Sequence, residues 1–155
     1  MSAFKLLFHR GGVYLPRLNL WLDSHEPQAN GTVFVSHAHS DHTEIHREII
    51  VSSPTSQLMR ARLAGEWVEH VLPFRKPWEL SRGEIPCEIT LLPAGHIFGS
   101  AMSWIKAGGE TLLYTGDFKL RASLSAERCE RSARMFLSWK QRTAAPNISF
   151  HRPAT

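Results

Sequence analysis

The chain has 155 residues, 43% hydrophobic and 21% charged, a composition that predicts one globular domain and excludes a disordered protein. Its net charge of +4 invites a nucleic-acid interpretation, yet residues 1–124 hold 12 basic and 12 acidic side chains. All of the excess positive charge lies in residues 125–155. The overall charge is therefore no evidence for nucleic-acid binding.

The sequence has neither a membrane-spanning pattern nor an export pattern. No apolar run approaches the roughly 20 residues that cross a bilayer, and residues 1–12 lack the long apolar centre of a signal peptide. We therefore expect a cytoplasmic protein with no membrane partner. Cys87 and Cys129 make no disulfide framework and lack the close spacing of a thiolate zinc site, so we expect two reduced thiols.

Short apolar runs bounded by Gly, Pro, Ser or Asn predict strands at 18–22, 32–36, 48–52, 88–92, 103–107 and 111–115. The segment "AGGE" between the last two runs predicts an antiparallel hairpin, because glycine supplies the positive backbone dihedrals of tight turns. The segment "SSPTSQLMRARLAG" has a Ser cap, Pro54 in its first turn and Gly65 just past its end. These start and stop signals are typical of one helix, so we expect a mixed α and β domain.

The stretch "HAHSDH" places His37, His39, Asp41 and His42 in one loop directly after an apolar run. Imidazole nitrogens suit zinc, and a carboxylate can complete or bridge such a site. If the loop leaves the end of a strand, alternation points the first two histidines the same way, and the following turn presents the other two ligands on another side. We expect this one loop to provide ligands for two metal ions. Chance clustering among nine histidines is the competing explanation.

Two further candidate ligands follow strand-like runs at glycine turns: His96 in "LLPAGHIFGSA" and Asp117 in "LLYTGDFKL". Functional sites on α/β scaffolds gather at such strand ends. Taken alone, His96 would be a buried structural histidine and Asp117 a turn cap. Together with the first loop they favour a metal site. The three aspartates of the chain, Asp23, Asp41 and Asp117, all lie at or just after an apolar run.

The ordered set "HAHSDH", "AGHIFGSA" and "YTGD" resembles the metallo-β-lactamase superfamily. "PAGHIFGSA" followed by "LLYTGDFKLR" is similar to its β-CASP nuclease branch, which includes ligase-associated DNA exonucleases and RNA 3′-end processing enzymes. The resemblance covers the amino-terminal portion of that family. It implies an α/β fold over 1–130 that is an incomplete αββα sandwich, its first half, with a mixed β-sheet and flanking helices.

By position, the resemblance implies six metal ligands: His37, His39 and His96 on one zinc, Asp41 and His42 on a second, and Asp117 bridging the two. Manganese is the alternative metal. Asp23 matches the acidic residue that supports the metal loop. Two divalent cations roughly 3.5–4 Å apart would activate a shared water for attack on a phosphodiester, with Asp41 and Asp117 in the catalytic site.

The implied function is a two-zinc nuclease acting on DNA or RNA. A small-molecule metallo-hydrolase, such as a thioesterase or lactonase, is the alternative enzyme, although the "GHIFGSA" turn disfavours it. A third hypothesis is a metal-binding remnant without catalysis. This hypothesis is based on family motifs that the sequence lacks, namely another metal-binding histidine, a general-acid histidine and the inserted β-CASP domain. Without the second half of the sandwich, the strands are expected to lack one packing layer. The sequence leaves the oligomeric state open.

Residues 131–155 form a basic tail that departs from the family pattern. The family continues with a strand that ends in a Glu-x-Thr-Tyr-Gly-like turn, whereas this sequence reads "ARMFLSWKQRTAAPNISFHRP". A one-nucleotide shift, for a suitable choice of codons, would restore "DVLIMEATYG". We hypothesise that the chain leaves its ancestral reading frame between Glu130 and Arg134. The competing explanation is a basic amphipathic helix over 125–142.

The remaining histidines match no motif and are expected to be structural or surface residues: His9, His25, His46, His70 and His151. His46 is close enough to the metal loop in sequence to support a ligand.

Overall fold

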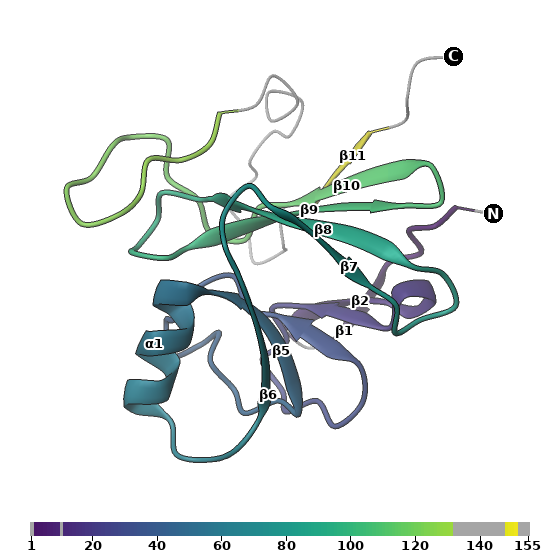
Figure 1. Cartoon of the computed structure of the whole chain (residues 1–155), viewed down its shortest axis with the longest axis horizontal. Coiled ribbons are helices and arrows are strands. Elements are labelled where there is room, and N and C mark those ends of the chain that lie inside the picture. The colour runs from purple at the N-terminus through teal and green to yellow at the C-terminus, as the bar shows by residue number, and fades with distance from the viewer. Residues whose placement is uncertain (1, 10, 132–147, 152–155) are drawn as a thin grey trace.

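The computed structural model describes residues 2–9, 11–131 and 148–151. These residues form two β-sheets that face each other, with one α-helix beside the first sheet (Figure 1). The first sheet contains, in spatial order, β1 (Leu7–His9), β2 (Gly12–Leu15), β3 (Leu20–Leu22), β4 (Thr32–Phe34), β5 (Glu48–Ser52) and β6 (Val68–Leu72). The strands from β1 to β3 pair antiparallel, and those from β3 to β6 pair parallel.

The second sheet is antiparallel throughout and lies above the first in Figure 1. Its strands are β7 (Pro77–Leu80), β8 (Cys87–Pro93), β9 (Ala101–Ala107), β10 (Glu110–Tyr114) and β11 (Ile148–His151), in the spatial order β11, β10, β9, β8, β7. The predicted hairpin is confirmed, because β9 and β10 pair antiparallel and both Gly108 and Gly109 have positive φ angles.

Two short helical elements connect strands of the first sheet. The 3₁₀ turn η1 (Pro16–Leu18) joins β2 to β3, and α1 (Ser53–Arg62) is the crossover from β5 to the parallel strand β6. The predicted helix is confirmed with its cap, since the Ser52 side chain accepts a hydrogen bond from the backbone N–H of Thr55 at 3.3 Å. Among the described residues, no helix has the length and apolar character needed to cross a membrane.

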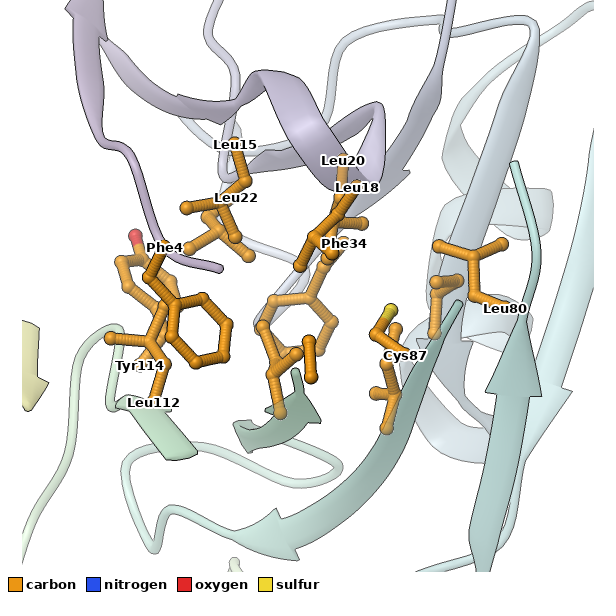
Figure 2. Packing of buried hydrophobic residues seen from close by; sticks show 14 of the residues in the cluster. Phe4, Leu15, Leu18, Leu20, Leu22, Phe34, Leu80, Cys87, Leu112 and Tyr114 are labelled. Carbon is orange, nitrogen blue, oxygen red and sulfur yellow. The ribbon is translucent and has the colours of Figure 1, made fainter. Parts of the chain in front are cut away.

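The main core lies between the two sheets (Figure 2). Leu20, Leu22 and Phe34 of the first sheet pack toward Leu112 and Tyr114 of the second. A smaller cluster joins α1 to the outer face of the first sheet, with Val33, Ala38 and Met59 fully or almost fully buried. The central strands β4 and β5 are thus covered on both faces, which explains why their sequences are continuous apolar runs rather than alternating ones.

The packing corrects one expectation. The sequence predicted strands that lack a packing layer, whereas the described residues supply both sheets and bury an apolar core between them. The structure also contains one α-helix in the described residues, where flanking helices were expected. The strands β1, β2, β6, β7 and β11 were not predicted. Of these, β6 and β7 carry exposed and polar positions, as "VEHVL" and "PWEL" show, so their apolar content gave no clear signal.

The tail of the chain is described only in part. Residues 125–131 are not helical, so the amphipathic helix expected over 125–142 is absent from this described portion. The backbone of 148–151 pairs with β10 in antiparallel register. Residues 132–147 and 152–155, and with them the segment of the proposed frame change after Arg131, lie outside the described residues. Both cysteines are free, in agreement with the expected reduced thiols, and both are buried.

Candidate metal centre

The first candidate loop begins where the parallel strand β4 ends. The backbone N–H of Ser36 donates to Oδ1 of Asp23 at 2.7 Å, and its carbonyl accepts from the N–H of Ala101 at 2.8 Å. Farther along, the N–H of His42 donates to the carbonyl of His39 at 3.0 Å and closes a turn. The loop is therefore fixed at its start to both sheets and folded back on itself at its end.

The second candidate loop connects β8 to β9 and presents His96. The hydroxyl of Ser100 accepts hydrogen bonds from the backbone N–H groups of His96 and Ile97, at 3.0 and 3.2 Å. Gly95 and Gly99 take positive φ angles of 74° and 81°, which a residue with a side chain would adopt at a cost. The loop is thus a compact turn in which Ser100 fixes the backbone of the histidine.

Asp117 follows β10, next to a glycine that lies close to the first candidate loop. Gly116 has a φ of 52°, and a Cβ atom there would lie 2.8 Å from the Cβ of Ser36. Only glycine lets the end of β10 approach the first candidate loop this closely. The turn brings Asp117 beside His96, with 3.7 Å between the Asp117 carboxylate and Nε2 of the histidine.

Three histidines from the two loops converge on one point. His37, His39 and His96, called here the three-histidine cluster, have ligand nitrogens that all lie within 4.8 Å of one another. Nε2 of His37 is 3.0 Å from Nδ1 of His39, and Nε2 of His96 is 3.4 Å from the same Nδ1 atom. Residues that lie far apart in the sequence are therefore brought together, as the sequence predicted for candidate ligands at strand ends.

A second group shares one histidine with the first. His37, His42 and Asp117, called here the mixed cluster, also have ligand atoms within 4.8 Å of one another. The Asp117 side chain lies against both clusters, because it is also 3.7 Å from His96, and it is 60% exposed. Asp41 is outside both clusters. It lies 3.6 Å from Nε2 of His42, and its side chain is 68% exposed.

Asp23 lies beneath the mixed cluster and is buried. Its backbone has a φ of 46°, a left-handed conformation that Asp tolerates better than most residues. Its Oδ2 atom accepts a hydrogen bond from the hydroxyl of Tyr114 at 2.9 Å and lies 3.7 Å from Nδ1 of His42. Asp23 thus joins the end of β3, the first loop and the second sheet through one carboxylate.

Burial and charge separate the histidine pKa values. Burial, and secondarily the neighbouring His42, lower the pKa of His37 to about 4. Burial also lowers the pKa of His96, against the opposing charge of Asp117. Burial favours the neutral form of His42 as well, but its contact with Asp23 and the nearby charges of Asp41 and Asp117 raise its pKa. His37 and His96 are therefore held as neutral imidazoles, the form that ligates metals.

The buried groups under the cluster have shifted pKa values of their own. Burial alone would raise the pKa of Asp23, but its contact with His42 and its hydrogen bonds from Ser36 hold that pKa below the usual value. Burial, followed by the charge of Asp23, raises the pKa of Tyr114 well above its usual value. Tyr114 therefore stays a neutral donor to an ionised carboxylate.

The three-histidine cluster fits a tetrahedral zinc ion. Zn–N bonds of about 2.0–2.1 Å at tetrahedral angles place two ligand nitrogens about 3.3–3.4 Å apart. Of the observed separations, 3.4 Å agrees with this spacing and 3.0 Å is shorter. Three imidazoles with one adjacent carboxylate are also a donor set suited to zinc and other borderline metals. The mixed cluster offers two imidazoles and a carboxylate, which suit a second divalent cation.

The other histidines lie outside the two clusters. His46 is 1% exposed, its Nδ1 accepts from the N–H of Gln28 at 3.2 Å, and burial lowers its pKa to about 4. His25 packs its ring edge-on against His42, with 4.9 Å between centroids. His70 pairs with Glu48 at 2.7 Å, His9 packs against Trp21, and the side chain of His151 is not described.

Sequence reasoning missed the residues that hold the loops in place. Three such residues make hydrogen bonds to the loops or to Asp23: Ser36, Ser100 and Tyr114. Each lies within a motif that was singled out for its histidine or aspartate. Hydroxyl groups within four residues of a candidate ligand were the available signal, because groups near a ligand in the chain can orient it.

Comparison with known proteins gives partial matches. A protein named probable DNA ligase from Opitutus terrae is 56% identical over 119 residues, which are 76% of this chain and 11% of that protein. The 5′ exonuclease Apollo from Rattus norvegicus is 32% identical over 129 residues, 75% of this chain and 24% of that protein. Protein artemis from Homo sapiens is 28% identical over 110 residues, 56% of this chain and 16% of that protein. No family model matches the sequence.

These relatives share only part of their length with this chain. The chain spans no more than 24% of the length of any of the three proteins, so the likeness concerns one part of each. Artemis and Apollo are β-CASP metallo-β-lactamase nucleases. The chain therefore belongs to the β-CASP nuclease branch of the metallo-β-lactamase superfamily.

Proposed function

We propose that the chain carries a two-zinc centre for the hydrolysis of phosphodiester bonds in DNA or RNA. The relatives support a nucleic-acid-cleaving metallo-hydrolase at the level of the family. The observation that carries the proposal is the convergence of His37, His39 and His96, whose ligand nitrogens all lie within 4.8 Å of one another, since imidazole nitrogens are favoured zinc ligands. The two sheets and α1 would then be the ββα part of an αββα sandwich.

In this proposal the ligands divide between two ions. The three-histidine cluster would hold one zinc, Asp41 and His42 would hold the second, and Asp117 would serve both. The position of the Asp117 carboxylate against both clusters supports its bridging role. Asp41 stands 3.6 Å from His42 and is exposed, so it would approach the second ion from the solvent side. Manganese is the alternative metal for the same oxygen and nitrogen donors.

The residues of the chain have defined tasks around these ions. When bound, the cations supply Lewis-acid activation of water and neutralise charge on the phosphodiester. Asp23 holds the ring of His42 at 3.7 Å and, through the N–H of Ser36, fixes the start of the ligand loop. Asp117 and Asp41 are exposed at the surface, so cations held by these carboxylates would be open to a substrate phosphate.

The test is a comparison of substrates and variants on the purified chain. The chain is freed of metal, reloaded with zinc or manganese, and assayed on labelled single-stranded DNA, on RNA and on a thioester. We expect metal-dependent cleavage of DNA or RNA that is lost in His39→Gln and retained in His70→Gln, since His70 pairs with Glu48 outside both clusters. Cleavage of the thioester alone would identify the small-molecule hydrolase instead.

A second outcome separates catalysis from binding. Zinc binding that depends on His39, without turnover of any substrate, would support the metal-binding remnant and overturn nuclease activity of this chain alone. Zinc content equal in the wild type and in His39→Gln would overturn the metal centre itself.

The division into a family portion over 1–130 and a basic tail over 131–155 stays a proposal, as does the cytoplasmic location. Sequencing the gene tests the frame change, which fails if no single-base shift near Glu130 restores an open frame with the family's next motif. Fluorescence microscopy of the tagged chain tests the location.

A further inference from the structure

Helix α1 touches both candidate loops, one at each end. Its first turn meets the loop 94–100, and its last turn meets the loop 36–42. Between these ends it is anchored on the outer face of the first sheet, where Met59 packs with Val33, Val35 and Ala38. The helix is thus a rigid element, about 15 Å long for ten residues, between the two sources of histidine ligands.

The contact at the amino-terminal end is made by two buried hydroxyls. Ser52 and Thr55 both donate from their side chains to the carbonyl of Gly99, at 2.6 and 3.1 Å. A Cβ atom on Gly99 would lie 2.6 Å from the Cβ of Pro54 and 2.9 Å from the backbone nitrogen of Thr55. The turn that carries His96 is therefore seated directly on the first turn of the helix.

The contact at the carboxy-terminal end is a charged hydrogen bond. Nη1 of Arg62 donates to the carbonyl of Ala38 at 2.5 Å. Ala38 is fully buried and lies between His37 and His39 in the chain. A guanidinium bond to this carbonyl fixes the orientation of the peptide that joins the two ligands, and charge-assisted bonds are about twice as strong as neutral ones.

We propose that α1 is a clamp that sets the distance between the His96 loop and the His37–His39 loop, with Arg62 and Thr55 as its positioning residues. This inference rests on the proposed metal centre. The three-histidine cluster needs ligand nitrogens about 3.3–3.4 Å apart, and its members come from loops that contact opposite ends of one helix. Residues that orient ligands in this way commonly change metal affinity by about 10–100-fold when they are replaced.

The neighbouring residues on the helix supply matched controls. Arg60 lies in the same last turn, but it pairs with Glu69 at 2.9 Å and stacks on Trp67. Ser56 lies beside Thr55, but its hydroxyl donates to Glu69 at 2.8 Å. Both controls remove side-chain contacts of a similar kind from α1 and touch neither candidate loop.

The experiment measures cobalt binding to the metal-free full chain by titration and by the visible absorption spectrum of the bound ion. We expect Arg62→Met and Thr55→Val each to weaken binding about tenfold and to alter the spectrum, whereas Arg60→Met and Ser56→Ala leave both unchanged. Arg62→Lys, which keeps a charged donor, should recover part of the affinity. It also serves as the test variant if Arg62→Met does not fold, as judged by circular dichroism.

The outcomes separate this inference from the proposed function. If the wild type binds no cobalt, the metal centre itself is wrong. If the wild type binds and Arg62→Met matches Arg60→Met in affinity and spectrum, the clamp is wrong. The double variant Arg62→Met, Thr55→Val should lose less affinity than the product of the single losses. Once one end of α1 no longer contacts its loop, the helix no longer sets the distance between the loops, so the contact at the other end matters less. Fully independent losses would show two separate supports and would overturn a single clamp.

Discussion

The two ligand clusters differ in how completely the protein forms them. The three-histidine cluster has nitrogens already 3.0 and 3.4 Å apart, and its His37 is fully buried. The mixed cluster depends on Asp117, whose side chain is 60% exposed, and on His42, which is tied to Asp23. Rigid ligands lose less freedom when a metal binds. We therefore expect the three-histidine cluster to bind metal more tightly.

The largest effect on zinc affinity is expected when the histidine that both clusters share is replaced. His37→Asn should lower zinc affinity by more than about 100-fold at both clusters, since replacing mere outer partners already costs about 10–100-fold. His39→Asn should remove only the tighter binding event, and His42→Asn only the weaker one. Calorimetric titration of metal-free protein measures these events separately. One tight equivalent of zinc retained by His37→Asn would contradict the shared role.

A change in the His96 loop should affect stability and one cluster only. Gly99→Ala forces a side chain into a φ of 81° and against Pro54 and Thr55, so we expect about 3 kcal/mol of destabilisation. Gly109→Ala is the control, because its φ is 77° with no atom within 4 Å of the added Cβ. It should cost about 1 kcal/mol. Urea unfolding of the metal-free chain gives both values, and equal losses would show that the contact with α1 is unimportant.

Replacing Asp23, which contacts His42, tests the mixed cluster separately. Asp23→Asn removes the charge beside His42 and should destabilise the fold by about 2 kcal/mol, because a buried donor network loses its ionised acceptor. It should also weaken metal binding at the mixed cluster about tenfold and spare the three-histidine cluster. Tyr114→Phe removes one hydrogen bond to the same carboxylate and should cost about 1 kcal/mol. Equal losses at both clusters would contradict this division.

The smallest effect is a separation of the clusters by pH. In the metal-free chain the pKa of His37 is lowered by burial to about 4, whereas that of His42 is raised from its usual value by Asp23, Asp41 and Asp117 despite burial. As the pH falls, His42 gains its proton first. Because a protonated imidazole cannot ligate, acid should detach His42 of the mixed cluster from metal before His37. An NMR titration of the histidine ring protons follows both groups, and a common midpoint would contradict the separation.

Local signals made part of this structure predictable. The helix over 53–62 follows from Ser52 and Pro54 at its start, and the hairpin follows from two adjacent glycines. The candidate ligands were recognisable because histidine and aspartate followed apolar runs at glycine turns, and the structure brings His37, His39, His42, His96 and Asp117 together. The assignment of each residue to one zinc or the other stays a prediction.

Long-range contacts account for what the sequence did not reveal. The hydrogen bond from Tyr114 to Asp23 and that from Arg62 to Ala38 join residues far apart in the chain, and neither partner carries a local pattern that indicates the other. The position of His37 in both clusters also depends on tertiary geometry, because alternation along a strand gives direction but not distance. The same holds for the packing of the two sheets against each other.

The hydrogen bond between Asp23 and Tyr114 has a consequence for the order of events during synthesis. Asp23 and the first loop leave the ribosome well before Tyr114 and Asp117, so the early histidines exist for a time without the second sheet. Metal captured at that stage would meet an incomplete ligand set. Correct loading should therefore follow the closure of these non-local contacts, which are the slow step for sheets paired across long chain separations.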